Sequence, residues 1–186
     1  RSDAGRDRAQ NISDIGYLGL LLVVPVVDST VAWLVHDDPY VAKQVLGIYA
    51  ETIAITGFLA ILIPRVVGRE RPLLGDGCFR EPSRPDCNPR ATVSFPSGHT
   101  AMTMASASTM FVHHIFLPLY GGGAGDAVAV SLAGALATTT GIARIAAVKH
   151  HTSDVIVGAL LGPRLGTTTP SSLHSPAPDG REGNSL

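Results

Sequence analysis

The chain has 186 residues, of which 45% are hydrophobic and only 16% are charged, which is an apolar composition for a soluble domain of this size. Its formal net charge of −1 excludes the broad basic surface with which proteins attract nucleic acids. We therefore expect one membrane-embedded domain without a nucleic-acid partner, in which any anion-binding site is built locally.

Four apolar stretches approach the roughly 20 helical residues that cross a bilayer. They are Ile15–Val35, Val45–Ile63, Thr100–Leu117 and Ala127–Val148. A fifth stretch begins at Val155 but soon reaches Pro163 and Gly166, which favours a short helix. No stretch alternates apolar and polar residues convincingly enough to predict a strand. The predicted fold is all-α: a membrane-embedded bundle of about five helices, the last one short.

Composition divides the chain into three parts. Residues 1–14 form a polar N-terminal segment, and residues 15–166 form the membrane domain. Residues 167–186 are rich in Ser, Thr, Pro and Gly, so we expect a disordered tail.

Polar side chains within the predicted spans require partners, because an ionisable group in hydrocarbon is costly. For Asp28 and Glu51 we expect hydrogen bonds between helices. For His113 and His114, near the end of their span, we expect a place at the membrane interface, since no third residue at useful spacing suggests a metal site.

The connection from residue 65 to residue 96 is long and contains six arginines. Long loops often carry function. The two cysteines, Cys78 and Cys87, both lie in this loop, which suits a disulfide on an oxidising side of the membrane.

Three clusters around this loop can hold a phosphate group. The first cluster includes Arg71, whose guanidinium can bind phosphate oxygens in a bidentate fork. The second, Ser97-Gly98-His99, precedes an apolar span, so the free amides of a helix N-terminus adjoin a histidine that can move protons.

The third cluster contains Arg144, His150 and Asp154. His150 and Asp154 are four residues apart on one helix face, so Asp154 can accept a hydrogen bond from Nδ1 and leave Nε2 free as a nucleophile. His151 is the competing nucleophile, but the residue four positions later is Val155, which cannot orient it. We therefore assign the nucleophile to His150.

The order of these motifs resembles the type 2 phosphatidic acid phosphatase superfamily, which also contains vanadium haloperoxidases. The resemblance covers about residues 65–162. It implies a helical bundle that acts through a phosphohistidine without a metal or other cofactor. It also implies roles for single residues: Arg71, Ser97, Gly98 and Arg144 hold the phosphoryl oxygens, His99 protonates the leaving group, His150 attacks, and Asp154 orients His150.

Two positions depart from the family pattern. The leading lysine of the family falls on Pro64, with Arg65 as the neighbouring cation, and the serine before Arg144 is Ala143. A six-residue offset turns Arg65 about 120° from Arg71 around a helix of ~3.6 residues per turn, although its long side chain and a kink at Pro64 could compensate. We expect Arg65 to join the phosphate-binding residues.

The resemblance implies hydrolysis of lipid phosphate monoesters or of polyprenyl and other lipid pyrophosphates, with membrane lipids as further partners. A soluble phosphate ester stays open as a substrate. Two other functions also stay open: a catalytically degenerate membrane protein that binds or assembles, and a vanadate-dependent haloperoxidase. The sequence does not predict the oligomeric state.

The expected location is a bacterial cytoplasmic membrane, with the site on the extracytoplasmic side. Most lysines and arginines lie on the motif side, which by itself indicates the cytoplasm. The two cysteines and the orientation usual in the family argue for the opposite side.

Overall fold

The structure is a computed structural model that describes residues 2–72 and 91–173. Its elements, in chain order, are α1 (Asp3–Leu18), the π-helical turn η1 (Gly19–Val23), α2 (Val24–Leu34), α3 (Pro39–Val67), α4 (Gly98–Phe116), α5 (Ala124–Ala146) and α6 (Thr152–Leu173). The first three form one continuous helix, Asp3–Leu34. The described residues therefore form five helical rods without a strand, which confirms the predicted all-α bundle.

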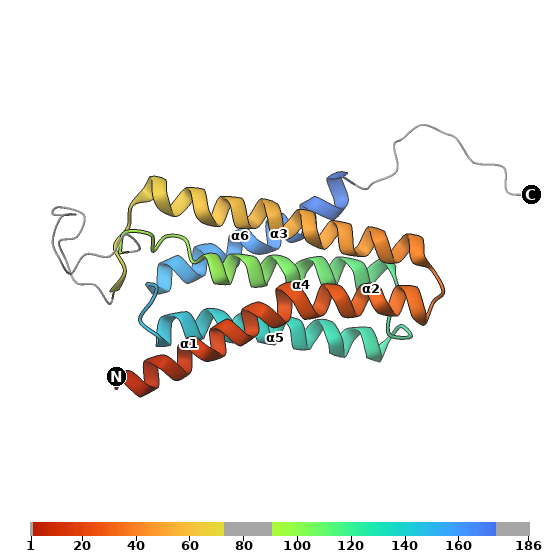
Figure 1. Ribbon diagram of the computed structural model, residues 1–186, viewed down its shortest axis with the longest axis horizontal. Helices are drawn as coiled ribbons and strands as arrows, with labels where there is room; N and C mark the ends of the chain where they lie inside the picture. Colours follow the sequence, from red (N-terminus) through yellow and green to blue (C-terminus); the bar gives the residue numbers. More distant parts are fainter. Residues whose placement is uncertain (1, 73–90, 174–186) are drawn as a thin grey trace, which may run out of the picture.

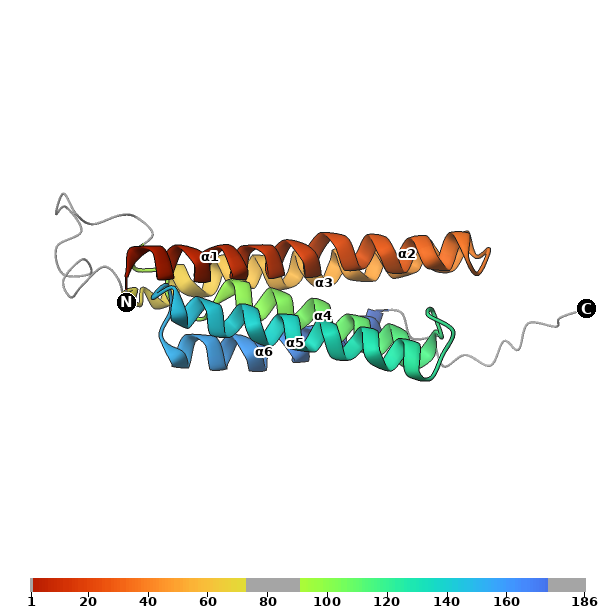
Figure 2. The same cartoon turned by 90° about the horizontal axis from the view of Figure 1, so that it is seen from below.

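The five rods run along a common long axis in two layers (Figures 1 and 2). The α1–α2 rod and α3 form one layer, and α4, α5 and α6 form the other. Helix α4 is central because it packs on α3, α5 and α6, while α1 packs on α5 and α2 packs on α3.

Among the residues that the structure describes, three helices are long and apolar enough to cross a membrane: Asp3–Leu34, Pro39–Val67 and Ala124–Ala146. The outer surfaces of these helices expose large apolar side chains such as Leu22, Phe58 and Leu132. The sequence also predicts a span at the stretch Thr100–Leu117. Its helix, α4, instead buries small polar side chains against its neighbours, and these are Thr100, Thr103, Ser106 and Thr109.

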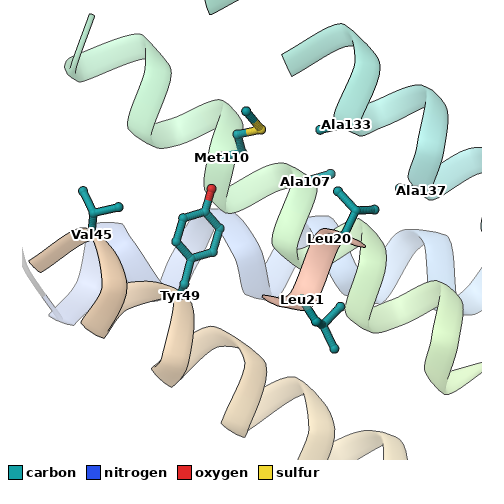
Figure 3. Close-up of a cluster of buried hydrophobic side chains, with 8 residues drawn as sticks. All are labelled: Leu20, Leu21, Val45, Tyr49, Ala107, Met110, Ala133 and Ala137. Carbon is teal, nitrogen blue, oxygen red and sulfur yellow. The ribbon is translucent and has the colours of Figure 1, made fainter. Parts of the chain in front are cut away.

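The main hydrophobic core joins the two layers near the middle of the bundle. Leu20 and Leu21 from the π-helical turn meet Tyr49 of α3, and the small faces of α4 and α5 complete the cluster (Figure 3). Because Ala133 and Ala137 are small, α5 can approach α4 and the first rod closely.

The prediction of a short last helix was wrong. Helix α6 runs for 22 residues and continues past Pro163 and Gly166 to Leu173. Threonine hydroxyls bond to carbonyls four residues earlier, as Thr167 does to Pro163 at 2.8 Å and Thr169 to Leu165 at 2.8 Å. The boundary expected at residue 166 therefore lies inside a helix, and residues 174–186 lie outside the described part.

Close packing on α4 explains why α6 continues. Gly158, Gly162 and Gly166 lie on one face of α6. A Cβ atom at these positions would come within 2.7 Å, 2.4 Å and 2.2 Å, respectively, of carbonyl oxygens at the N-cap of α4 and in its first two turns. The absence of side chains lets the two backbones touch, which is the usual role of small residues in membrane helix pairs. Tertiary packing thus outweighs the helix-breaking tendency of Pro163.

The N-terminal segment is not separate from the bundle either. Helix α1 begins at Asp3, and the Ser2 side chain caps it by accepting a hydrogen bond from the Gly5 amide. Gly16 allows α1 to lie against α5, since a Cβ there would be 2.3 Å from the Thr140 hydroxyl oxygen. Residues 3–14 therefore reach one end of the bundle as an extension of the first rod.

A buried polar cluster closes the other end of the bundle. Asp28 accepts hydrogen bonds from Tyr49 at 2.7 Å and from Tyr120 at 2.5 Å, which confirms the expected contacts between helices. His114 lies beside Asp126, with 2.5 Å between Nδ1 and Oδ1. His113 and His114 are both buried between helices, and their expected place at the level of the membrane interface stays a prediction. Glu51, in contrast, lies on the exposed face of α3.

Replacement of Gly162 by alanine should destabilise the bundle, because the new methyl group would meet the Ala101 carbonyl. Overpacking of this kind costs about 1–3 kcal/mol. Gly134→Ala in α5 is the matched control, since a Cβ there has no neighbour within 4 Å. Thermal unfolding in detergent, followed by size exclusion, should show a lower midpoint only for Gly162→Ala. Equal midpoints would contradict the close α4–α6 contact.

Candidate active site

All three sequence clusters meet at one end of the bundle. The start of α1, the end of α3, the start of α4, the end of α5 and the α5–α6 connection come together there (Figure 1). They enclose a cavity of about 1040 Å³. Its wall carries Arg65, Arg71, Arg144 and Lys149 as cations, Asp14 as an anion, and the imidazoles of His99 and His150.

His150 lies in the connection between α5 and α6, and its side chain is buried. Its Nδ1 is 2.7 Å from the carbonyl oxygen of Ser94. A carbonyl can only accept a hydrogen bond, so Nδ1 carries the proton and Nε2 keeps a lone pair. The Nε2 atom of His150 can therefore act as a base or a nucleophile at the cavity wall.

Electrostatics keep His150 neutral. Burial, and then the positive charge of Arg144, lower the pKa of its imidazole from the ordinary 6.5 to about 3. A neutral imidazole with a free lone pair is the form that can act as a nucleophile. The arginine whose charge lowers this pKa lines the same cavity.

Asp154 does not bond directly to His150, contrary to our expectation. Its Oδ2 is 3.8 Å from Nδ1, beyond hydrogen-bonding distance. Asp154 instead accepts bonds from the Ser94 hydroxyl at 2.5 Å, from the His151 amide at 2.8 Å and from Arg69 at 2.7 Å. Its action on His150 therefore passes through Ser94, whose carbonyl orients the imidazole.

His151, the competing candidate for the nucleophile, contacts a residue outside the cavity. Its Nε2 lies 3.2 Å from the carbonyl oxygen of Glu70, and it is absent from the described cavity wall. The structure thus separates the two adjacent histidines, with only His150 on the wall.

Of the three motif residues at the start of α4, two line the cavity and one does not. Gly98 and His99 line it, and Gly98 also packs on Ala60, to whose Cβ an added Cβ would come within 3.2 Å. Ser97 is fully buried and is not among the described lining residues. Its hydroxyl accepts a bond from Thr100 at 2.9 Å, while its amide donates to the Asp154 carbonyl. Ser97 therefore joins α4 to α6 in this structure.

The four cations of the wall come from four different segments: α3, the α3–α4 connection, α5 and the α5–α6 connection. Gly68 ends α3 in a left-handed conformation with φ 67°, which turns the chain toward Arg71. The Arg71 amide donates to the Ala91 carbonyl at 2.8 Å and fixes that turn. Arg144 reaches the cavity from the last turn of α5, where its Nη1 donates to Ser13 at 3.2 Å.

Arg65 also lies on the wall despite the unfavourable offset. It follows Pro64, which is buried, and its Nη1 is 3.3 Å from the Ile61 carbonyl of its own helix. A second cation, Lys149, directly precedes His150 and lines the same cavity. The cavity that Pro64 lines thus also holds two cations, Arg65 and Lys149, of which we expected only Arg65 from the sequence.

Three contributors escaped the sequence analysis. Lys149 lies within the spacer between Arg144 and His150, where only its identity as a cation was visible. Ser94 acts through its carbonyl, which every residue has, so no side-chain pattern could reveal it. Asp14 lies in the segment assigned outside the domain, far from the motifs in sequence.

No group of three or more His, Cys, Asp or Glu side chains that could hold a metal ion occurs within residues 2–72 and 91–173. Cys78 and Cys87, expected to form a disulfide, lie outside the described residues.

The family model described as the PAP2 superfamily matches residues 45–174. The chain belongs to the PAP2 superfamily. The match includes all three motifs and leaves out the α1–α2 rod. Membership supports phosphatase activity in general and agrees with the resemblance drawn from the motifs.

Among solved structures, the chain is similar to one described as the first transmembrane PAP2 type phosphatidylglycerolphosphate phosphatase, from Bacillus subtilis. The identity is 19%, the TM-score is 0.65, and the alignment covers 92% of this chain and 77% of that one. At this identity the likeness establishes the fold. No protein with a curated description matches significantly. Together with the three apolar helices, the shared fold identifies an integral membrane protein.

The lowered pKa of His150 predicts that this ring does not titrate between pH 5 and pH 8. Protonation is disfavoured in the folded protein, so the neutral form should persist until the pH approaches about 3. Nitrogen-15 NMR of histidine-labelled protein, assigned with His150→Gln, should show one Nδ1-protonated tautomer throughout that range. A titration midpoint near 6.5 would contradict the electrostatic account.

Proposed function

We propose that the protein is a phosphatase that hydrolyses lipid phosphate monoesters or lipid pyrophosphates through a phosphohistidine at His150. One observation carries this proposal: His150, with Nδ1 bonded to a carbonyl and Nε2 available, shares a cavity with Arg71, Arg144 and His99. The two arginines are suited to a phosphoryl group, since guanidinium forks match its oxygens.

In the first step, Nε2 of His150 attacks phosphorus and forms a P–N bond while the bond from phosphorus to the leaving oxygen breaks. His99, as an imidazolium, gives its proton to that oxygen. The arginines stabilise the negative charge on the transferring group. The products of this step are the dephosphorylated alcohol, or a lipid monophosphate from a pyrophosphate, and phosphorylated His150.

In the second step, water attacks phosphorus and the P–N bond breaks. His99, now neutral, accepts a proton from the attacking water, so inorganic phosphate is released and both histidines return to their starting states. Every proton and electron pair in this sequence is supplied by the substrate, water and these two side chains.

Lateral access to the cavity supports a lipid substrate. The wall includes Leu18 of α1 and Ile61 of α3, which are 52% and 57% exposed on the outside of the bundle. At this end, α1 and α3 diverge (Figure 1). A head group could enter between these helices while its acyl or prenyl chain stays against the apolar outer surface, an arrangement that a soluble ester does not need.

The departures from the family pattern are compatible with activity. A degenerate, non-catalytic role was suggested by Pro64 and by a short last helix, but α6 is complete over 22 residues. We propose that Arg65 supplies a phosphate-binding cation at the rim of the cavity, where it replaces the lysine absent at Pro64. Ser97 and Gly98 remain proposed phosphate ligands through their place at the start of α4.

Brief reaction with a phosphorus-labelled lipid phosphate, followed by an alkaline quench, should trap label on His150, because phosphohistidine survives base and is lost in acid. His150→Gln should abolish both the label and phosphate release. His151→Gln is the matched control and should retain both, since His151 contacts Glu70 instead of the cavity. Label that persists in His150→Gln would contradict the proposed nucleophile.

The substrate class is tested with a panel of purified lipid monophosphates, lipid pyrophosphates and short soluble phosphate esters in detergent. We expect the long-chain substrates to give the higher kcat/KM, because their chains can remain on the apolar surface beside Leu18 and Ile61. Equal efficiency for short soluble esters would contradict lateral lipid entry while leaving the chemistry intact.

We also propose that the catalytic end faces the extracytoplasmic side of a bacterial cytoplasmic membrane. In intact cells, a membrane-impermeant thiol reagent should label Cys78 and Cys87 only after a reductant has opened their disulfide. Labelling that requires permeabilised cells would place the catalytic end in the cytoplasm, in line with the distribution of positive charge.

A further inference from the structure

Asp14 is an acidic side chain on the wall of a cavity whose other described charged residues are arginines and a lysine. Its Oδ1 lies 3.2 Å from Nε2 of His99 and 3.6 Å from Nη1 of Arg144. It belongs to α1, outside the part of the chain that matches the family model. Neither the motifs nor the family assignment therefore gives this carboxylate a role.

The position of Asp14 is fixed by packing on both sides of it. Ser13, its neighbour, is fully buried, donates to the Gln10 carbonyl at 2.9 Å and accepts from Arg144. One turn later, the Tyr17 ring lies on the His99 ring with 4.4 Å between centroids. These contacts hold α1 against the start of α4 and the end of α5, so the Asp14–His99 contact is part of the packed bundle.

The charges around His99 make this carboxylate important. Burial, and then the positive charges of Arg144 and Arg71, lower the pKa of the His99 imidazole from the ordinary 6.5 to about 4. Asp14 acts in the opposite direction and raises this pKa. A general acid, however, must carry its proton before the leaving group departs. Asp14 is the anion in direct contact with His99, so it stabilises the imidazolium that the first step requires.

The contact also distinguishes the two nitrogens of His99. Since Nε2 donates to Asp14, Nδ1 is the nitrogen left to exchange a proton with the substrate. The same bond remains after the proton has left, because the neutral ring keeps hydrogen on Nε2. Nδ1 then has the lone pair that accepts a proton from water in the second step.

We propose that Asp14 is a positioning residue for the general acid: it holds His99 through Nε2 so that Nδ1 delivers the proton to the leaving oxygen. This inference rests on the proposed function, in which His99 protonates that oxygen. The α1 helix thereby contributes directly to turnover, in addition to its packing role.

Leaving-group dependence provides the test. Asp14→Asn should lower kcat about tenfold or more for an alkyl phosphate, whose alkoxide requires a proton, but change it less than about twofold for 4-nitrophenyl phosphate. Asp7→Asn removes the same charge from an exposed position on α1 and should leave both rates unchanged. A double variant with His99→Ala should lose no more than His99→Ala alone.

Equal losses on both substrates, or additive losses in the double variant, would overturn the inference. If His99→Ala itself shows no leaving-group dependence, the proposed role of His99 fails instead, so the two failures are distinguishable. Asp14→Glu keeps the charge and should retain more alkyl phosphatase activity than Asp14→Asn. The ratio of the alkyl rate to the 4-nitrophenyl rate within one variant does not depend on the folded fraction, so this ratio is the quantity compared; a ratio in Asp14→Glu no higher than in Asp14→Asn would also overturn the inference.

Discussion

The buried carboxylate of Asp154 connects the segments on which the catalytic end depends. It bonds to Arg69 after α3, to Ser94 before α4 and to the amide of His151 before α6. A carboxylate this deeply buried is tolerated only with such partners, because an unpaired buried charge costs several kcal/mol. The network thus fixes three chain segments relative to one another and places the Ser94 carbonyl that orients His150.

This indirect arrangement changes how the third motif is understood. The spacing of His150 and Asp154 predicted a direct hydrogen bond along one helix face, but His150 lies before α6 begins, so the helical geometry does not apply to it. The carboxylate and the imidazole are connected through Ser94 instead. Local spacing predicted that these two side chains lie close together, as they do at 3.8 Å, whereas the residue that connects them depends on a contact between positions 56 residues apart.

The helical class and the meeting of the three motifs could be predicted because apolar length and motif order are local properties of the sequence. The length of α6 could not be predicted, because Pro163 and Gly166 locally favour the end of a helix. Only packing against α4 stabilises the helix past these two residues. Asp14 and Ser13 were missed for a related reason. Their segment looks polar and unattached in sequence, yet Gly16 and Tyr17 pack it onto α5 and α4.

The two ends of the bundle use polar groups differently. At the end opposite the cavity, Asp28 has tyrosine partners, and the nearby Asp126 lies against His114, which suits a structural connection between helices. At the catalytic end, the cations face a cavity large enough for a substrate, and His150 keeps one nitrogen uncommitted. The cationic cavity thus lies at one end of the bundle, whose outer surface is apolar.

The central claim is that phosphate passes through a covalent intermediate on His150. The most direct measurement is the stereochemical course at phosphorus, with a substrate made chiral by oxygen isotopes. Two successive in-line displacements, first by His150 and then by water, predict net retention of configuration. Net inversion would show a single displacement by water and would contradict the account.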